Sequence, residues 1–222
     1  MSDALQATIG SLGDRAVLLT LHGDREGCNR GIVRLSAILS AECREESPRT
    51  IVDVVPALVS LAVFFDPRLV SARTIERRLL ALADGLTDPG PDSAARLHVI
   101  PVWYDGPDLA EVARLVRLDP DEIVRRHTDR EYRVRFLGFA PGFAYLGPLP
   151  PSLVVPRRSE PRRRVPAGSV AIAGDQTAVY PLDTPGGWQL IGRTTLRPFD
   201  PSRSPPSQFA AGDRVRFVRV AS

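Results

Sequence analysis

Hydrophobic and polar positions in the first 86 residues follow two periods. Short apolar runs rich in β-branched residues predict three strands, at 16–21, 50–55 and 58–65. Apolar positions spaced three and four residues apart predict amphipathic helices over 29–45 and from Ser71 to about Leu86, with Ser71 as the N-cap of the second. The order β-α-β-β-α favours a small α+β sandwich in which two helices cover one face of an antiparallel sheet.

The pattern then changes. Residues 87–95 hold Pro, Gly and small side chains without an apolar period, which is typical of a linker. Further on, the spacing predicts one strand and two helices, at 97–103, 108–116 and 119–127. The second helix has Asp119 as N-cap, Pro120 at its first position and Glu122 placed for a capping box.

Beyond residue 131 the helical period gives way to short apolar runs separated by most of the Pro and Gly of the chain. The main runs are YRVRFLGF, SVAIAG, TAVYPL, WQLIG and DRVRFVRV. They are typical of a closed or nearly closed β-barrel, with 200–208 as a surface loop. The fold class expected is therefore α+β but mainly β, with a sandwich domain over 1–90 and a β-barrel domain over 96–222.

Composition places the chain among ordinary soluble globular proteins. Of its 222 residues, 43% are hydrophobic and 25% are charged. No run approaches the roughly 18 apolar residues of a membrane span, and the first residues do not resemble a signal peptide. Cys28 and Cys43 are too few for a disulfide framework. We expect a cytoplasmic protein with no membrane partner.

All 29 basic residues are arginine, so a catalytic or phosphate-loop lysine is excluded although the net charge is only +3. Residues 124–164 hold ten arginines against three acidic residues, a local excess of seven positive charges. This excess is compatible with an anion site, because guanidinium groups bind carboxylate or phosphate in pairs of hydrogen bonds. A solvated face is the more common arrangement, particularly for Arg125, Arg126, Arg158 and Arg163. Nucleic acid is not expected, since the segment lacks interleaved aromatic residues.

Known catalytic and cofactor motifs are missing from the sequence. Its three histidines are scattered and neither cysteine has metal-ligand spacing to a histidine, so no metal site is expected. The sequence has no GxxxxGK[ST], no strand followed by GxGxxG and no GxSxG. Ser169 and His127 could be imagined as nucleophile and base, although a serine in PAGSV more often lies in a turn or starts a strand.

The second half of the chain is rich in aromatic, proline and glycine residues that could form a binding site. Prolines precede Arg157 and Arg162, and a proline-stiffened loop presents a guanidinium at a lower entropic cost. Gly186 and Gly187 permit close backbone approaches. The other polar and aromatic candidates are Phe139, Phe143, Tyr145, Gln176, Thr177, Trp188 and Arg193.

The motifs GFxPGFxYLG, PRxxxPRxxVPAGSVAIAG, QTxxYP, PGGW and IGRT, in this order, resemble the KipI / allophanate hydrolase subunit 1 family. The resemblance extends upstream through GDRAVLL, YDGPDL and RHTDREYRV, and departs at Ala178 and Thr184, where Gly and Ser are usual. It implies a cyclophilin-like β-barrel behind a smaller α+β domain. Bacterial members of the family are chiefly the B subunit of an ATP-dependent 5-oxoprolinase.

The resemblance also implies a function and partners. Such a protein works with a related barrel protein, the C subunit of 5-oxoprolinase, and with the A subunit, which has a different fold. The complex opens the lactam of 5-oxo-L-proline to L-glutamate, with ATP and Mg²⁺ bound at the level of the complex and by no recognisable motif in this chain. We expect the isolated chain to be inactive.

This chemistry suggests roles for the candidate residues. Arg157, Arg162 and Arg193 would hold anions, and His127 would be a general base or, alternatively, a structural histidine. Phe139, Phe143, Tyr145 and Trp188 would form apolar walls beside Gly186 and Gly187, with Gln176 and Thr177 as hydrogen-bonding partners.

Two other functions are compatible with the sequence. The family includes an inhibitor of a sensor histidine kinase, and its members also occur in fusions within urea-degrading enzymes. Prolyl isomerase activity would follow from fold analogy alone and ranks last, because a fold does not determine a function.

Overall fold

A computed structural model describes residues 5–45, 47–84, 86–87 and 95–220. The chain divides into two compact units, Met1–Ser93 and Ala94–Ser222. Most of the linker expected at 87–95 lies outside the described residues.

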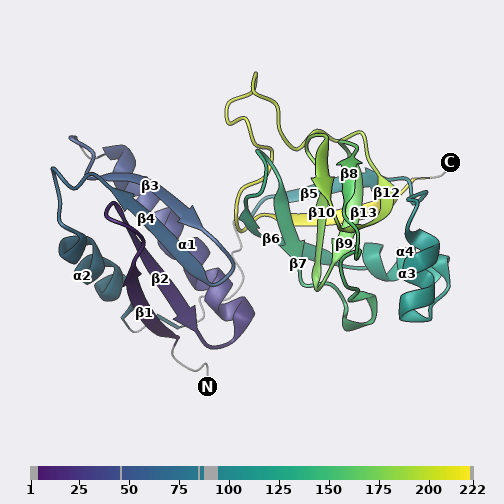
Figure 1. Cartoon of the computed structure of the whole chain (residues 1–222), viewed down its shortest axis with the longest axis horizontal. Helices are drawn as coiled ribbons and strands as arrows, with labels where there is room; N and C mark the ends of the chain where they lie inside the picture. Colours follow the sequence, from purple (N-terminus) through teal and green to yellow (C-terminus); the bar gives the residue numbers. More distant parts are fainter. Residues whose placement is uncertain (1–4, 46, 85, 88–94, 221–222) are drawn as a thin grey trace. The chain divides into compact units, whose positions relative to one another are not determined.

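The first unit is a four-stranded antiparallel sheet with two helices (Figure 1). Along the chain its elements are β1 (Gln6–Ser11), β2 (Ala16–His22), α1 (Arg25–Glu45), β3 (Ile51–Pro56), β4 (Ser60–Phe65) and α2 (Ala72–Ala83), and the strand order is β1-β2-β4-β3. Alternate residues of β2 (Val17, Leu19 and Leu21) are buried in one core with residues of both helices, so both helices cover the same face of the sheet.

The order β-α-β-β-α is confirmed, with one strand added in front of it. The strand β1 is an edge strand whose only contributions to the core are the partly buried Ala7 and Ile9, which explains its weak pattern. Ser71 caps α2 as expected, since its side chain accepts a hydrogen bond from the Thr74 amide.

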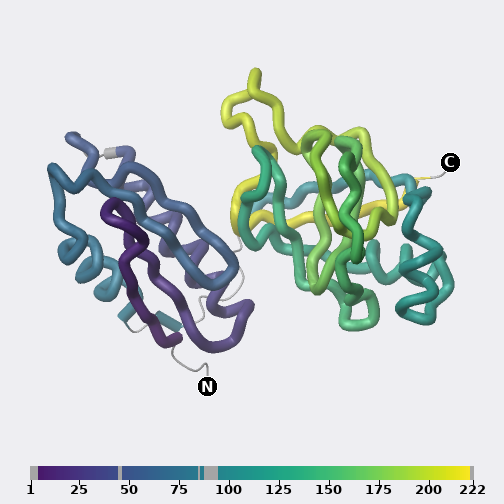
Figure 2. Tube along the Cα trace, in the orientation of Figure 1, coloured from purple at the N-terminus to yellow at the C-terminus, as the bar shows by residue number. Residues whose placement is uncertain are grey.

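The second unit is mainly β. Its elements are β5 (Leu97–Val102), α3 (Leu109–Val116), α4 (Pro120–Thr128), β6 (Glu131–Leu137), β7 (Ala144–Gly147), a 3₁₀ turn η1 (Pro151–Leu153), β8 (Arg162–Val165), β9 (Ser169–Ala173), β10 (Gln176–Val179), β11 (Thr184–Gly186), β12 (Gln189–Arg193) and β13 (Arg214–Arg219). Seven of these strands form one sheet in the order β12-β9-β10-β7-β6-β13-β5. The pair β8 and β11 forms a separate ribbon, and a long loop joins β12 to β13 (Figure 2).

This sheet curves into a nearly closed barrel, as the sequence pattern predicts. An antiparallel bridge between Trp103, just after β5, and Arg193 at the end of β12 joins its first and last strands. The barrel interior is filled by aliphatic side chains from almost every strand, and Val112 and Ile123 of the two helices belong to the same core.

One detail of helix α4 differs from expectation. Asp119 caps the helix through the Asp121 amide, with Pro120 following it. Glu122, however, does not complete a capping box, because its carboxylate accepts hydrogen bonds from Arg125 and Arg126 instead. A charge-assisted bond to a guanidinium here replaces the weaker bond to the N-cap amide.

Candidate functional site

The edges of the barrel meet along a seam, which we define as the contact of residues 103–108 with residues 190–193. Its backbone bonds include Trp103 N–H to Arg193 O at 2.9 Å and Asp108 N–H to Leu190 O at 3.0 Å. A Cβ atom on Gly106 would lie 2.3 Å from the carbonyl carbon of Ile191, so only glycine fits there. The glycine of YDGPDL is thus explained by barrel closure.

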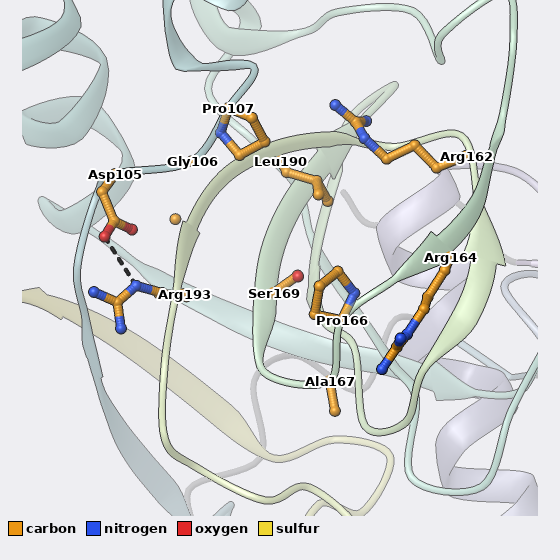
Figure 3. A pocket seen from close by; sticks show the side chains of 11 residues that line it. Asp105, Gly106, Pro107, Arg162, Arg164, Pro166, Ala167, Ser169, Leu190 and Arg193 are labelled. Atoms are coloured by element: carbon orange, nitrogen blue, oxygen red, sulfur yellow. Dashed lines mark hydrogen bonds and ion pairs between the residues drawn. The ribbon is translucent and has the colours of Figure 1, made fainter.

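A cavity of about 330 Å³, the seam cavity, opens beside this contact (Figure 3). Its walls come from the segment after β5, from β12, and from β8 to β9. The lining residues are Asp105, Gly106, Pro107, Arg162, Arg164, Pro166, Ala167, Ser169, Leu190, Gly192 and Arg193. Two expected anion-binding residues, Arg162 and Arg193, therefore share one cavity.

Each arginine of the seam cavity is already paired with a carboxylate. Arg193 donates from Nε to Asp105 at 2.8 Å, and its guanidinium lies 5.3 Å from the centre of the Trp103 ring. Arg162 donates to Asp108 at 2.6 Å, and Arg164 binds Asp183. Figure 3 shows the three guanidinium groups at separate places around the cavity. They do not converge on one point, as a single anion would require.

A second cavity, the aromatic cavity, has a volume of about 280 Å³. Its lining residues are Phe139, Phe143, Tyr145, Arg157, Pro161, Tyr180, Pro185, Gly186, Gly187 and Trp188. Phe143 is buried at the centre of the aromatic cluster, with its ring edge-on to Tyr145, Tyr180 and Trp188 at centroid distances of 4.9, 5.2 and 5.6 Å. Such edge-to-face contacts fix the rings in place. All four residues of the expected apolar wall therefore line this cavity, together with Gly186 and Gly187.

Arg157 differs from the arginines of the seam cavity. It is exposed and lines the aromatic cavity, and among the described residues it has no hydrogen bond or ion pair. Burial raises the pKa of both Tyr145 and Tyr180, so these hydroxyl groups stay protonated at neutral pH. The cavity therefore combines an unpaired cation, neutral hydroxyl groups and aromatic rings.

Phe139 stands at the rim of the aromatic cavity in a strained conformation. Its φ is +69°, in the left-handed region that non-glycine residues seldom adopt, and its side chain is 62% exposed. Its ring lies edge-on to Phe143 at 5.3 Å. Strain of this kind concentrates at functional sites.

Asp108, which lines neither cavity, binds both Arg162 of the seam cavity and Arg158, the neighbour of Arg157. One carboxylate oxygen accepts from Arg158 at 3.0 Å and from Arg162 at 2.6 Å, and the other accepts from the Leu190 amide at 2.7 Å. Its side chain is only 4% exposed. Asp108 occupies the N-cap position of α3 yet makes no cap bond. The motif YDGPDL was its only signal, and that motif does not reveal which arginines it binds.

The arginine-rich segment is therefore not a free cationic face. Arg135 is buried and paired with Asp175 at 3.0 Å, and Arg125 binds Glu122 and Asp129 on α4. Arg158, expected on a solvated face, binds the buried Asp108. Carboxylates from distant parts of the barrel unit supply much of the balancing charge.

His127 has both ring nitrogens engaged by other side chains, an arrangement typical of a structural histidine. It is fully buried in α4, where Nδ1 lies 2.7 Å from the Tyr104 hydroxyl and Nε2 lies 3.0 Å from the Thr177 hydroxyl. Thr177 donates its proton to Ala171 O, so Nε2 of His127 donates to Thr177 and Nδ1 accepts from Tyr104. Burial lowers the pKa of His127 to about 3, so the ring is neutral.

Three further candidates are placed outside a catalytic arrangement. Thr177 is fully buried and its hydroxyl is hydrogen-bonded to His127, so it is not available to a substrate. Gln176, its neighbour on β10, lines neither cavity. Ser169 lines the seam cavity, but both ring nitrogens of His127 are engaged elsewhere, so the two residues form no nucleophile–base pair.

The described ranges contain no group of three His, Cys, Asp or Glu side chains arranged to hold a metal ion. No helix in the same residues is long and apolar enough to cross a bilayer.

Comparison with known proteins identifies relatives over most of the chain. A family model described as the carboxyltransferase domain, subdomain C and D, matches residues 7–209. The 5-oxoprolinase B subunit of Bacillus subtilis (strain 168) is 41% identical in an alignment 230 residues long, which covers 96% of this chain and 92% of the relative. The 5-oxoprolinase B subunit of Escherichia coli O157:H7 is 48% identical over 174 residues, covering 76% of this chain and 78% of the relative.

Solved structures show the same fold. TTHA0988 is 40% identical with a TM-score of 0.79, and the match covers 94% of this chain but only 40% of that larger one. The conserved uncharacterized protein PH0987 from Pyrococcus horikoshii is 38% identical with a TM-score of 0.54, covering 96% of this chain and 97% of its own. The urea amidolyase of K. lactis, at 20% identity and a TM-score of 0.77, shares the fold over 99% of this chain and 15% of that one.

Proposed function

Since the chain belongs to the carboxyltransferase-domain family, subdomain C and D, we propose that it is the B-type subunit of an ATP-dependent 5-oxoprolinase complex. The observation behind the proposal is its similarity, along nearly its whole length, to proteins named as the B subunit of 5-oxoprolinase. The substrate proposed is 5-oxo-L-proline and the product is L-glutamate.

The reaction needs an energy source because a lactam is a stable amide and water is a weak nucleophile. Transfer of the γ-phosphoryl group of ATP to the amide oxygen, with release of ADP, would make the carbonyl carbon a good electrophile. One water would then add to that carbon, the C–N bond would break, and the protonated ring nitrogen would leave as the amine of glutamate. A second water would cleave the resulting acyl phosphate to the carboxylate and inorganic phosphate. A site for this reaction must hold the substrate carboxylate and stabilise developing negative charge.

The described residues fit a binding role better than a complete catalytic role. His127 is enclosed and neutral, and it forms no nucleophile–base pair with Ser169, because both of its ring nitrogens bind other side chains. The described part of the chain holds no group of three side chains that could bind a metal ion, and we propose that ATP and Mg²⁺ are bound elsewhere in the complex. Arg157 and the aromatic residues of the aromatic cavity would bind and orient substrate.

If this chain binds substrate without a complete set of catalytic groups, other proteins must supply those groups. We propose that the chain assembles with a related barrel protein, the C subunit of the complex, and with the A subunit, which has a different fold. These partners would supply the ATP site and the groups that move protons. The isolated chain would then show no turnover.

Reconstitution tests the proposal. The chain is combined with the two candidate partners, and glutamate formation from 5-oxo-L-proline is measured with and without ATP. We expect glutamate only when ATP and all three chains are present. Equal turnover in a mixture without this chain, or no ATP-dependent glutamate from any combination, would show that the proposal is wrong.

A further inference from the structure

We propose that the aromatic cavity is the site that recognises the small lactam acid, with the substrate carboxylate on Arg157 and the ring against Phe143, Tyr145 and Trp188. The ligand class is a compact, uncharged ring bearing one carboxylate. The inference rests on the proposed function for the identity of the lactam, and on the geometry of the cavity for the location.

Charge distinguishes the two cavities. Every arginine of the seam cavity has a carboxylate partner, Asp105, Asp108 or Asp183, so its positive charge is balanced before an anion enters. Arg157 has no such partner among the described residues and stands beside aromatic walls. A guanidinium next to low-dielectric walls attracts a carboxylate more strongly than one in open water, and it can bind both carboxylate oxygens.

The segment that bears Arg157 is held in place although the guanidinium itself is unpaired. The next residue, Arg158, donates its amide to Gly187 O at 2.7 Å and its side chain to the buried Asp108 at 3.0 Å. Pro156 on the other side fixes its own φ. The backbone of Arg157 is thus ordered before the ligand arrives, which lowers the entropic cost of binding.

The walls suit a small ring. A Cβ atom on Gly186 would lie 2.4 Å from the Tyr180 hydroxyl, so glycine at this position lets that hydroxyl reach the wall. Because burial keeps the hydroxyls of Tyr145 and Tyr180 protonated, each can donate a hydrogen bond to a lactam oxygen. A cavity of about 280 Å³ is slightly smaller than the usual small-molecule site of about 300–1,000 Å³, which favours a compact ligand.

Direct binding tests the location without requiring turnover. The full chain is titrated with 5-oxo-L-proline, and binding is followed by calorimetry and by tryptophan fluorescence. Of the two tryptophans, Trp188 lines the cavity and Trp103 does not. 2-Pyrrolidinone, which has the ring but no carboxylate, is the matched ligand control. Arg157→Gln is compared with Arg163→Gln, an exposed arginine nearby that lines neither cavity.

We expect 5-oxo-L-proline to bind, with Arg157→Gln and the loss of the carboxylate each weakening the affinity by about 10- to 100-fold. Arg163→Gln should change it less than about twofold, as for an exposed charge that touches no ligand. Absence of binding, or equal affinity in Arg157→Gln and the parent chain, would overturn the proposal.

The site and the function can fail separately. If the chain binds 5-oxo-L-proline through Arg157 but no complex hydrolyses it, the location of the site is supported and the proposed reaction is wrong. If the complex is active and its KM is unchanged by Arg157→Gln, the reaction stands and the location is wrong.

Discussion

Asp108 offers the sharpest test of how the barrel unit holds its candidate site together. Its buried carboxylate accepts hydrogen bonds from Arg158, Arg162 and the Leu190 amide, and so joins the loop before β8 to the seam. The substitution Asp108→Asn keeps the size of the side chain but removes its charge. It also turns an amide group toward donors, so at least one of the three bonds is lost.

The expected loss in the free energy of unfolding of Asp108→Asn follows from the burial of this carboxylate. Removing one partner of a buried ion pair costs about 3–5 kcal/mol. The side chains of Arg158 and Arg162 are 34% and 22% exposed, and this partial hydration lowers the cost to about 2–3 kcal/mol. For a unit of this size, we expect the unfolding temperature to fall by about 10 °C.

Thermal unfolding measures this change. Both tryptophans of the chain, Trp103 and Trp188, belong to the barrel unit, so their fluorescence reports its transition and not that of the first unit. Asp105→Asn is the matched control, since Asp105 lies three residues away and its pair with Arg193 is exposed on both sides. That control should cost less than about 1 kcal/mol. Equal shifts in the two variants would refute the reasoning.

Three other predictions concern the barrel unit. Gly106→Ala should destabilise it by about 3 kcal/mol in chemical denaturation, because the added Cβ would lie 2.3 Å from a backbone atom of the seam. Gly138→Ala is the control and should be tolerated in the same assay, since its Cβ would have nothing within 4 Å. The ring of His127, with its pKa lowered to about 3, should stay neutral at pH 5 by NMR, and an imidazolium signal appearing near pH 6.5 would contradict its burial. Its folded-state pKa lies below the unfolded value of about 6.5, so its contribution to stability is complete above that pH and falls by about 1.4 kcal/mol per pH unit as the pH drops toward 3. Asp119→Ala should cost about 1 kcal/mol by removing the α4 cap in urea unfolding, and an unchanged midpoint would speak against that cap.

Local structure was largely predictable from sequence. Apolar spacing located both helices of the first unit, and Ser71 and Asp119 marked two helix starts correctly because an N-cap bond spans only two or three residues. The run 16–21 corresponds to the strand Ala16–His22. The edge strand β1 was missed, since a strand that buries little has little pattern to read.

The candidate site was predictable in its residues but not in its grouping. Aromatic and glycine-rich motifs pointed to Phe143, Trp188 and Gly186, which do line one cavity. The same reasoning joined Arg157 to Arg162 and Arg193, which the fold places in a different cavity. The side on which a side chain emerges depends on alternation along a strand and, outside strands, on the path of the loop. Spacing in the sequence does not predict the path of a loop.

Sequence alone determined the class of fold, most of the elements and the family, because these depend on short-range periodicity and on long contiguous motifs. Tertiary structure alone decided what the charges do. Asp108 and Arg162 are 54 residues apart in the chain yet 2.6 Å apart in space, and His127 meets Thr177 across 50 residues. Electrostatic and hydrogen-bond partners depend on distance in space, and only the closing of the barrel sets that distance. It neutralised the arginines of the seam cavity, enclosed the one candidate base, and left Arg157 facing the aromatic cavity.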